Sequence, residues 1–270
     1  MKTLRTKLEK RESIQATLER CRRFDYDYIP FGDKWVMPTD KYPYRQKFFG
    51  KIAQGFLRTV MCIFGPVLLK VVYGAKVTGK KNRRAIKGQG AISVCNHFSY
   101  LDTLMIRQAI GHMKSYHTMG PRNNKKGFGG AFLRHGGMWA FSSNLAAMRA
   151  LHSEMELRLN AGSIVNFYAE QAMWVNYQKP RPMLDGAFFY AVKYRVPVLP
   201  VFCTFHKNRK GHIKRLRINI LPAVYADETL KKSERIADIK RRAEAEWQKC
   251  YEEYYGVKLA YLEKKSGDKQ

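Results

Sequence analysis

The chain has 270 residues, of which 45% are hydrophobic and 13% aromatic. This composition supplies enough apolar material for a packed core and excludes a disordered or fibrous chain. The 50 Lys and Arg outnumber the 22 Asp and Glu, and the resulting formal charge of +28 indicates a polyanionic partner: nucleic acid, an anionic membrane or a phosphate-bearing substrate. The five cysteines are scattered and form no Cys-x-x-Cys pair, which argues against a disulfide framework or a structural zinc site and favours a reducing cytoplasm.

The first 74 residues predict a region that associates with a membrane. Residues 1–23 have the apolar spacing of a basic amphipathic helix and lack the apolar core of a secretory signal, and residues 24–47 predict an irregular connection. The apolar stretch 59–69 is too short to span a bilayer, and Gly65-Pro66 in its middle is expected to break a helix. We therefore predict two short apolar helices within 48–73 that enter one leaflet or lie at its surface, with a buried core hairpin as the alternative. The cations that flank this pair, and that suit anionic head groups, are Lys47, Lys51, Arg58, Lys70 and Lys76.

Residues 75–227 alternate short apolar runs with helical stretches, which is typical of an α/β domain. Strands are predicted at 91–95, 163–167, 196–202 and 216–221, and helices at 102–110 and 145–159. We expect a mostly parallel or mixed sheet flanked by helices. The C-terminal region, 228–270, begins with a charged amphipathic helix over 228–255.

Acidic residues are missing from long stretches of the predicted domain. Between residues 40 and 154 the only acidic residue is Asp102, and between 156 and 185 the only one is Glu170. Each follows a predicted apolar strand, which is where α/β folds place their active sites. The alternative for each is an ordinary helix cap.

His97 stands five residues before Asp102, across a predicted turn between strand and helix. A carboxylate at that offset can fold back onto the imidazole, fix its tautomer and stabilise the imidazolium. Histidine is a suitable general base near neutral pH, and the absence of a Gly-x-Ser-x-Gly elbow from the sequence disfavours a covalent hydrolase. The pair therefore predicts direct activation of a substrate hydroxyl, with a purely structural His–Asp hydrogen bond as the alternative.

These residues resemble the glycerolipid acyltransferases, the family of lysophosphatidate and glycerol-3-phosphate acyltransferases. Its first block is Asn-His, four residues, Asp, and Asn96, His97 and Asp102 match it. Its third block, Phe-Pro-Glu-Gly, is replaced by Phe-Tyr-Ala-Glu-Gln at 167–171, which retains the glutamate. Its fourth block is matched by Val-Pro-Val-Leu-Pro at 196–200. The resemblance covers about residues 75–225 and points to a bacterial branch of the family.

The resemblance implies an O-acyltransferase that moves a fatty acyl group from acyl-CoA or acyl carrier protein to a hydroxyl of a lysophospholipid or related glycerolipid, 1-acylglycerol-3-phosphate first among them. His97 would be the general base and Asp102 its partner. Glu170 would position the acceptor, and backbone amides near it would stabilise the oxyanion. The substrate-binding residues so implied are Asn96, Ser99, Arg134, Glu170, Gln171 and Pro200.

The resemblance further implies that the chain uses no metal and no cofactor besides the donor. It would lie on the cytoplasmic face of the cell membrane, as a peripheral or monotopic protein, with anionic lipids and the acyl donor as partners and without nucleic acid.

The second block departs from the family pattern. In the family an arginine there binds the acceptor phosphate, but Asn144 stands at roughly that place, and Arg134, Arg122 or Lys126 is left to supply the charge. A glycolipid or other non-phosphatidate acceptor is therefore the first alternative. A relative that only binds lipid is a second. A basic nucleic-acid-binding protein is a third, although zinc-finger spacing and RNA-recognition aromatics are absent from the sequence.

Overall fold

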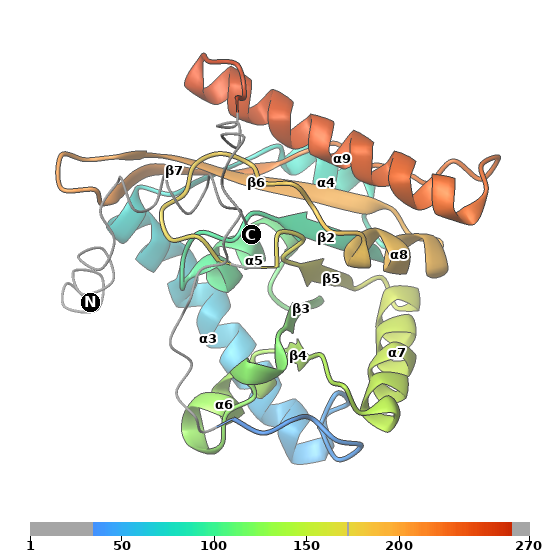
Figure 1. Ribbon diagram of the computed structural model, residues 1–270. Coiled ribbons are helices and arrows are strands. Elements are labelled where there is room, and N and C mark those ends of the chain that lie inside the picture. The colour runs from blue at the N-terminus through green and yellow to red at the C-terminus, as the bar shows by residue number, and fades with distance from the viewer. Residues whose placement is uncertain (1–34, 172, 261–270) are drawn as a thin grey trace, which may run out of the picture.

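The computed structural model describes residues 35–171 and 173–260, so the helix predicted at 1–23 lies outside the described residues. Seven strands form one twisted sheet (Figure 1). Its order is β1 (Lys76–Thr78), β7 (Ile213–Ile220), β6 (Val198–Lys207), β2 (Ala91–Cys95), β5 (Ile164–Phe167), β3 (Ser115–Met119) and β4 (Met138–Ala140). Strands β6 and β7 pair antiparallel, and the other neighbours in this sheet pair parallel. The predicted α/β fold with a mixed, mostly parallel sheet is confirmed.

Helices cover both faces of the sheet, which explains why the central strands are continuous apolar runs instead of alternating ones. One face packs against α3 (Phe48–Tyr73) and α5 (Asp102–Ile110) through Leu69 and Met105. The other face packs against α7 (Leu145–Asn160), α8 (Gly186–Lys193) and α9 (Lys232–Tyr255) through side chains such as Leu151, Phe188 and Trp247. The shorter helices are α4 (Lys80–Ala85), η1 (Pro121–Asn123) and α6 (Gly127–His135).

The predicted pair of short apolar helices is wrong, because residues 48–73 form a single helix of 26 residues with Pro66 inside it. Gly65 marks a close approach and not a turn: a Cβ there would lie 2.8 Å from Leu104 Cδ1 of α5. Pro66 removes one backbone donor and faces solvent. The helix continues past it because α5 holds it on either side of the proline, with Leu69 only 1% exposed.

Arg58 is not one of the cations on the outer surface of α3, as the sequence had suggested. It is 3% exposed, donates to the Ser115 carbonyl at 2.9 Å and to the Met113 carbonyl, and lies over the ring of Tyr116. Arg58 therefore ties α3 to the start of β3. The other flanking cations are exposed as expected: Lys47, Lys51, Lys70 and Lys76.

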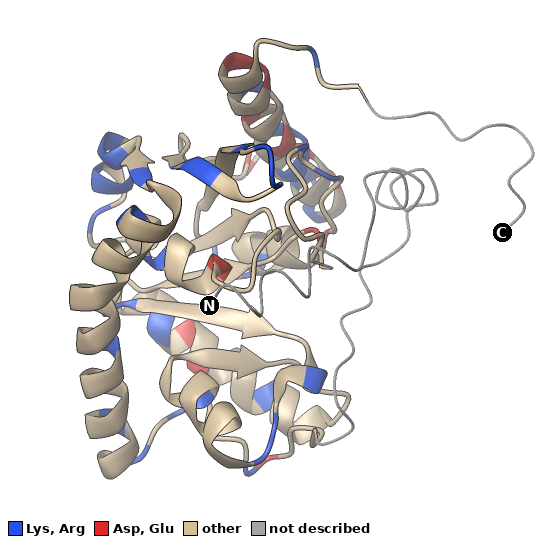
Figure 2. Ribbon diagram, turned by 90° about the vertical axis from the view of Figure 1, so that its left-hand side faces the viewer, with Lys and Arg blue, Asp and Glu red and all other residues tan. Residues whose placement is uncertain are grey.

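The outer face of α3 is apolar and uncovered. In Figure 2, α3 is the long helix that runs along one side of the domain. Among the described residues it is the one helix long and apolar enough to cross a membrane, with only 17% of its apolar window buried. A buried core hairpin, the alternative interpretation, is therefore wrong. The large apolar side chains exposed on it are Phe48, Phe49, Ile52, Phe56, Ile63, Phe64, Val67, Leu68 and Val71.

Candidate active site

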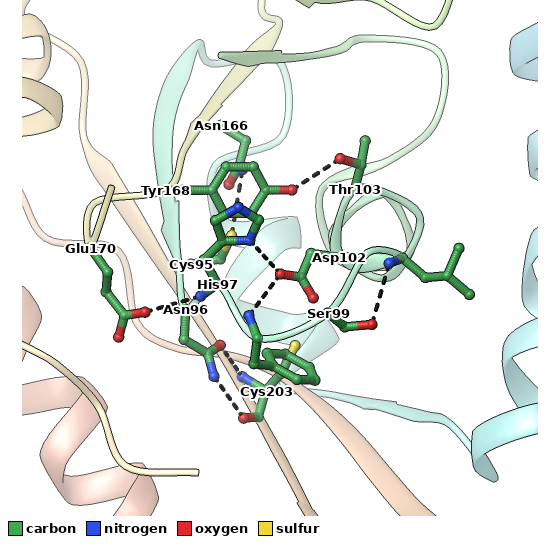
Figure 3. Close-up of polar contacts among 12 residues, drawn as sticks. Cys95, Asn96, His97, Ser99, Asp102, Thr103, Asn166, Tyr168, Glu170 and Cys203 are labelled. Carbon is green, nitrogen blue, oxygen red and sulfur yellow. Dashed lines mark hydrogen bonds and ion pairs between the residues drawn. The ribbon is translucent and has the colours of Figure 1, made fainter. Parts of the chain in front are cut away.

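The dyad predicted from the sequence is formed where β2 gives way to α5. The chain leaves the sheet after Cys95, turns through residues 96–101 and begins α5 at Asp102. His97 Nδ1 and Asp102 Oδ2 are 2.6 Å apart, and the Phe98 N–H donates to the same carboxylate oxygen at 2.9 Å (Figure 3). The Asp102 side chain is 2% exposed and that of His97 is 22% exposed. Asp102 thus supports the imidazole from the interior, and the remaining ring nitrogen, Nε2, is left for a substrate.

Burial governs the electrostatics of Asp102. Loss of solvent raises the pKa of the Asp102 carboxyl above its ordinary value, and the hydrogen bond and charge of His97 lower it in part. A carboxylate in this position is costly to the fold unless it is compensated by a positive charge. Protonation of His97 during a reaction supplies that charge, so the pair is suited to stabilising an imidazolium.

Tyr168 covers one face of the His97 ring, a contact that sequence reasoning missed. The two ring centroids are 4.0 Å apart with an interplanar angle of 23°. The Tyr168 hydroxyl lies 3.0 Å from Oγ1 of Thr103, the residue after Asp102. His97 is therefore held by Asp102 at one edge and by Tyr168 on one face. The only signal in the sequence was that a tyrosine stands in the altered third block.

Glu170 reaches His97 through the backbone. Its carboxylate is buried, and Oε2 accepts from the His97 N–H at 3.0 Å and from Arg181 Nη2 at 2.8 Å. Its Oε1 accepts from the Arg181 backbone N–H at 2.9 Å, and the Arg181 guanidinium lies over the ring of Trp174. Glu170 is not among the residues that line the cavity beside His97. The geometry favours a carboxylate that ties the catalytic turn to the segment around Arg181.

The backbone near Glu170 is also engaged. The Gln171 N–H, one of the amides expected to bind an oxyanion, donates to the Tyr168 carbonyl at 2.8 Å. Gln171 has φ 59°, in the left-handed region that favours glycine. It stands where the third block of the family has glycine, and a glutamine in this conformation carries a conformational cost that glycine does not. The exposed Gln171 side chain lines the cavity.

The remaining predicted site residues divide into cavity wall and scaffold. Ser99 lines the cavity, and its Oγ accepts from the Leu101 N–H at 3.3 Å. Asn96 lies outside the wall and pairs with the Cys203 backbone in both directions, at 3.0 and 2.9 Å. Pro200 is buried in β6 opposite Val94 and is also outside the wall.

Arg134 supports a turn instead of facing the cavity. It donates to Asn124 Oδ1 at 2.9 Å and to the Lys125 carbonyl at 3.0 Å. The turn it supports, residues 120–125, forms one wall of the cavity and contributes two cations, Arg122 and Lys125. Sequence reasoning named Arg122 but missed Lys125, which stands beside the suggested Lys126.

The cavity has a volume of about 1190 Å³ and opens beside His97. It lies at the carboxyl ends of β2, β3 and β5, where parallel sheets place ligand sites. Its apolar walls include Leu133, Met138, Phe141, Phe167 and Tyr190. A histidine backed by a buried carboxylate, at the edge of a cavity with apolar walls and two cations, is suited to a substrate that has an apolar chain, a hydroxyl and an anionic group.

Comparison with known proteins agrees with this geometry. Residues 74–204 match the protein family described as "Acyltransferase". No curated protein sequence matches the chain. Among solved structures, the fold is similar to the 1-acyl-sn-glycerophosphate (LPA) acyltransferase PlsC from Thermotoga maritima, with a TM-score of 0.51 over 75% of this chain and 84% of that chain. The two sequences are 19% identical, so the likeness concerns the fold.

Proposed function

On the premise that residues 74–204 belong to the acyltransferase family, we propose that the chain acylates a hydroxyl of a lysophospholipid or related glycerolipid. The acyl group would come from a thioester of coenzyme A or acyl carrier protein. The single observation that carries this proposal is the 2.6 Å contact of His97 with buried Asp102 at the edge of an apolar cavity.

The reaction follows from the orientation of the His97 ring. With Nδ1 on Asp102, the Nε2 atom removes the proton from the acceptor hydroxyl while its oxygen attacks the thioester carbonyl. The tetrahedral intermediate collapses, the carbon–sulfur bond breaks, and the imidazolium returns its proton to the thiolate. Asp102 and the Tyr168 ring face both favour the imidazolium that exists between these two transfers.

A phosphate-bearing acceptor, 1-acylglycerol-3-phosphate in particular, is favoured by the two cations of the cavity wall. Arg122 and Lys125 lie in a stretch from residue 103 to 153 that contains no acidic residue. They supply from the 120–125 turn the positive charge that is missing around Asn144. A glycolipid acceptor is the alternative, and neutralising both cations separates the two: Arg122→Gln with Lys125→Gln should raise the apparent KM for a phosphate acceptor and leave that for a neutral one unchanged.

We propose that the chain attaches to the cytoplasmic side of the cell membrane as a peripheral or monotopic protein, and the outer face of α3 supports the attachment. A helix of 26 residues is about 39 Å long, and its apolar side chains point away from the domain. Exposed Lys47, Lys51 and Lys70 suit anionic head groups. Changing Ile63 and Phe64 to Asp should release the protein from vesicles without unfolding it, since both side chains are exposed.

The direct test of the function is product analysis by mass spectrometry. Labelled acyl-CoA or acyl carrier protein is offered with a panel of lysolipids and glycolipids. His97→Ala should lower the rate about 10²–10⁴-fold through loss of the general base, with the fold unchanged. A His97→Ala variant that turns over like the parent would refute the mechanism.

A further inference from the structure

Helix α6 presents two phenylalanines to solvent beside the cavity. Phe128 is 86% exposed and Phe132 is 44% exposed, and their ring centroids are 6.5 Å apart, one turn along the helix. The same helix contributes Leu133 to the cavity wall. One side of α6 therefore borders the site, while the other is an uncovered aromatic surface.

Three exposed cations precede this aromatic pair in the chain. Arg122, Lys125 and Lys126 are exposed in the turn that leads into α6, and the stretch from residue 103 to 153 contains no carboxylate. We call these residues, Phe128, Phe132, Arg122, Lys125 and Lys126, the α6 patch. An aromatic tip with a basic rim is complementary to the interface of an anionic bilayer, where aromatic rings lie at the level of the head groups.

The α6 patch and the cavity wall are closely joined. A Cβ at Gly130 would clash with the Lys125 carbonyl oxygen, so α6 lies close against the turn before it. Arg134 of α6 donates to the same carbonyl at 3.0 Å. Because the helix and the turn form one unit, an object that binds Phe128 and Phe132 also lies against the wall of the cavity.

We propose that the α6 patch docks on an anionic lipid bilayer and brings the cavity to the lipid that it acylates. The proposal rests on the proposed function. A bilayer is favoured over an acidic carrier protein because α6 packs against α3, whose own outer face is apolar and exposed (Figure 1). The two helices then dock on the same bilayer, α3 along its length and α6 beside the cavity.

The test compares Phe128→Ser/Phe132→Ser with the parent. Sedimentation with phosphatidylcholine vesicles containing phosphatidylglycerol should show a roughly fivefold to tenfold loss of binding, because two exposed aromatic rings no longer enter the interface. The apparent KM for an acceptor embedded in those vesicles should rise by a similar factor. The kcat for a short-chain, water-soluble acceptor should be unchanged. Leu145→Ser is the matched control: Leu145 is 74% exposed at the start of α7, which packs on the face of the sheet opposite α3, and its loss should change neither quantity.

Two further variants make the result independent of catalysis and of the stability of the serine variant. Phe128→Trp should shift its fluorescence to the blue on addition of the same vesicles and be quenched by brominated lipid, and Lys126→Gln should weaken the binding only at low salt. A serine variant that binds vesicles and acylates embedded acceptor like the parent would overturn the proposal, as would a tryptophan that lipid leaves unquenched. Loss of acyl carrier protein binding with intact vesicle binding would assign the patch to a protein instead. If the parent acylates no acceptor, the proposed function fails, while the fluorescence still decides the docking.

Discussion

Asp102 and Glu170 are alike in sequence and different in structure. Both are isolated carboxylates that follow a buried strand, and both are almost inaccessible to solvent. Asp102 meets the His97 ring, whereas Glu170 meets the His97 backbone and Arg181. An isolated acid therefore led to the same region of the structure in both cases, but the atom that each acid faces sets the role we predict for it: Asp102 in the reaction and Glu170 in the fold.

Of the two carboxylates, Asp102 should have the larger effect on activity when it is replaced. Asp102→Asn should lower kcat about 10³–10⁴-fold, because the amide no longer fixes the His97 tautomer or stabilises the imidazolium. Its stability should not fall. The pKa of Asp102 is raised above its unfolded value of 3.8, so the folded state loses stability as pH rises past 3.8, and removing the charge relieves that loss at neutral pH. Measuring kcat and Tm on the same preparation of Asp102→Asn checks the predicted loss of activity and the predicted retention of stability.

Replacing Glu170 should have the opposite result, with a large loss of stability and a small loss of activity. Glu170→Gln leaves the 9%-exposed Arg181 without its carboxylate, which costs about 3 kcal/mol for a buried pair and lowers Tm by roughly 6–12 °C in a chain of this size. Activity below the melting temperature should fall far less than in Asp102→Asn. The double variant Glu170→Gln/Arg181→Met should recover part of the stability, because the buried guanidinium that lost its ion pair with Glu170 is removed as well. If instead the acceptor KM rises and Tm stays constant, Glu170 binds the acceptor and is not a structural carboxylate.

Replacing Tyr168 tests what the aromatic ring stacked on His97 contributes to the reaction. Tyr168→Leu should reduce kcat about tenfold with little change in donor KM, because stacking on an imidazolium contributes on the order of 1 kcal/mol. Tyr168→Phe keeps the ring and loses only the contact with Thr103, so it should recover to within about twofold of the parent. Phe189→Leu, which removes another aromatic from the cavity wall on α8, is the control for altered packing of the substrate. Equal kcat values for Tyr168→Leu and the parent would rule out a positioning role for Tyr168.

The smallest expected effect is on the pH dependence of stability, and it comes from a buried histidine outside the His97–Asp102 and Glu170–Arg181 pairs. His117 lies in β3 with no exposed surface, and burial together with the charges of Arg107 and Arg58 holds its pKa well below 6.5. Its contribution to stability is present above pH 6.5 and is lost as pH falls below that value, because only the unfolded chain takes up the proton. Between pH 7 and pH 6 the loss should be about 0.7 kcal/mol. Denaturant unfolding of the parent and of His117→Gln at pH 7 and pH 6 measures it, and parallel curves would contradict it.

The parts of the fold that the sequence predicted are those in which one physical signal dominates. The helix predicted at 102–110 has the bounds of α5, and the strand predicted at 91–95 has those of β2. Strand β3 was missed because its residues, Ser-Tyr-His-Thr-Met, are mostly polar, although all five are buried. Its polar side chains lie under Arg107 and beside Asn166, and those tertiary neighbours cannot be recognised in a single sequence.

Two errors at α3 have the same origin. Gly65-Pro66 has the local signature of a helix break, and Arg58 has that of a surface cation. The contacts that reverse both expectations, Gly65 with Leu104 and Arg58 with Ser115, join residues separated by about 40 to 60 positions. At the site, likewise, His97 and Asp102 were accessible to local reasoning. The partnership of Glu170 with Arg181 was not, because the arginine stands in a Lys-Pro-Arg-Pro run that is typical of a loop.

The pairing of Asn96 with Cys203 has a consequence for how the sheet ends. The primary amide of Asn96 accepts the Cys203 N–H and donates to the Cys203 carbonyl, so one side chain reproduces the two bonds that a peptide group makes in a β-ladder. The backbone of β2 can therefore leave the sheet after Cys95, while the Cys203 N–H and carbonyl of β6 both keep a hydrogen-bond partner. Only a side chain that is both donor and acceptor can replace a backbone peptide group in this way. Aspartate in its ionised form offers no proton, and leucine offers neither a donor nor an acceptor, so the Asn96 amide fixes where the turn that carries His97 leaves the sheet.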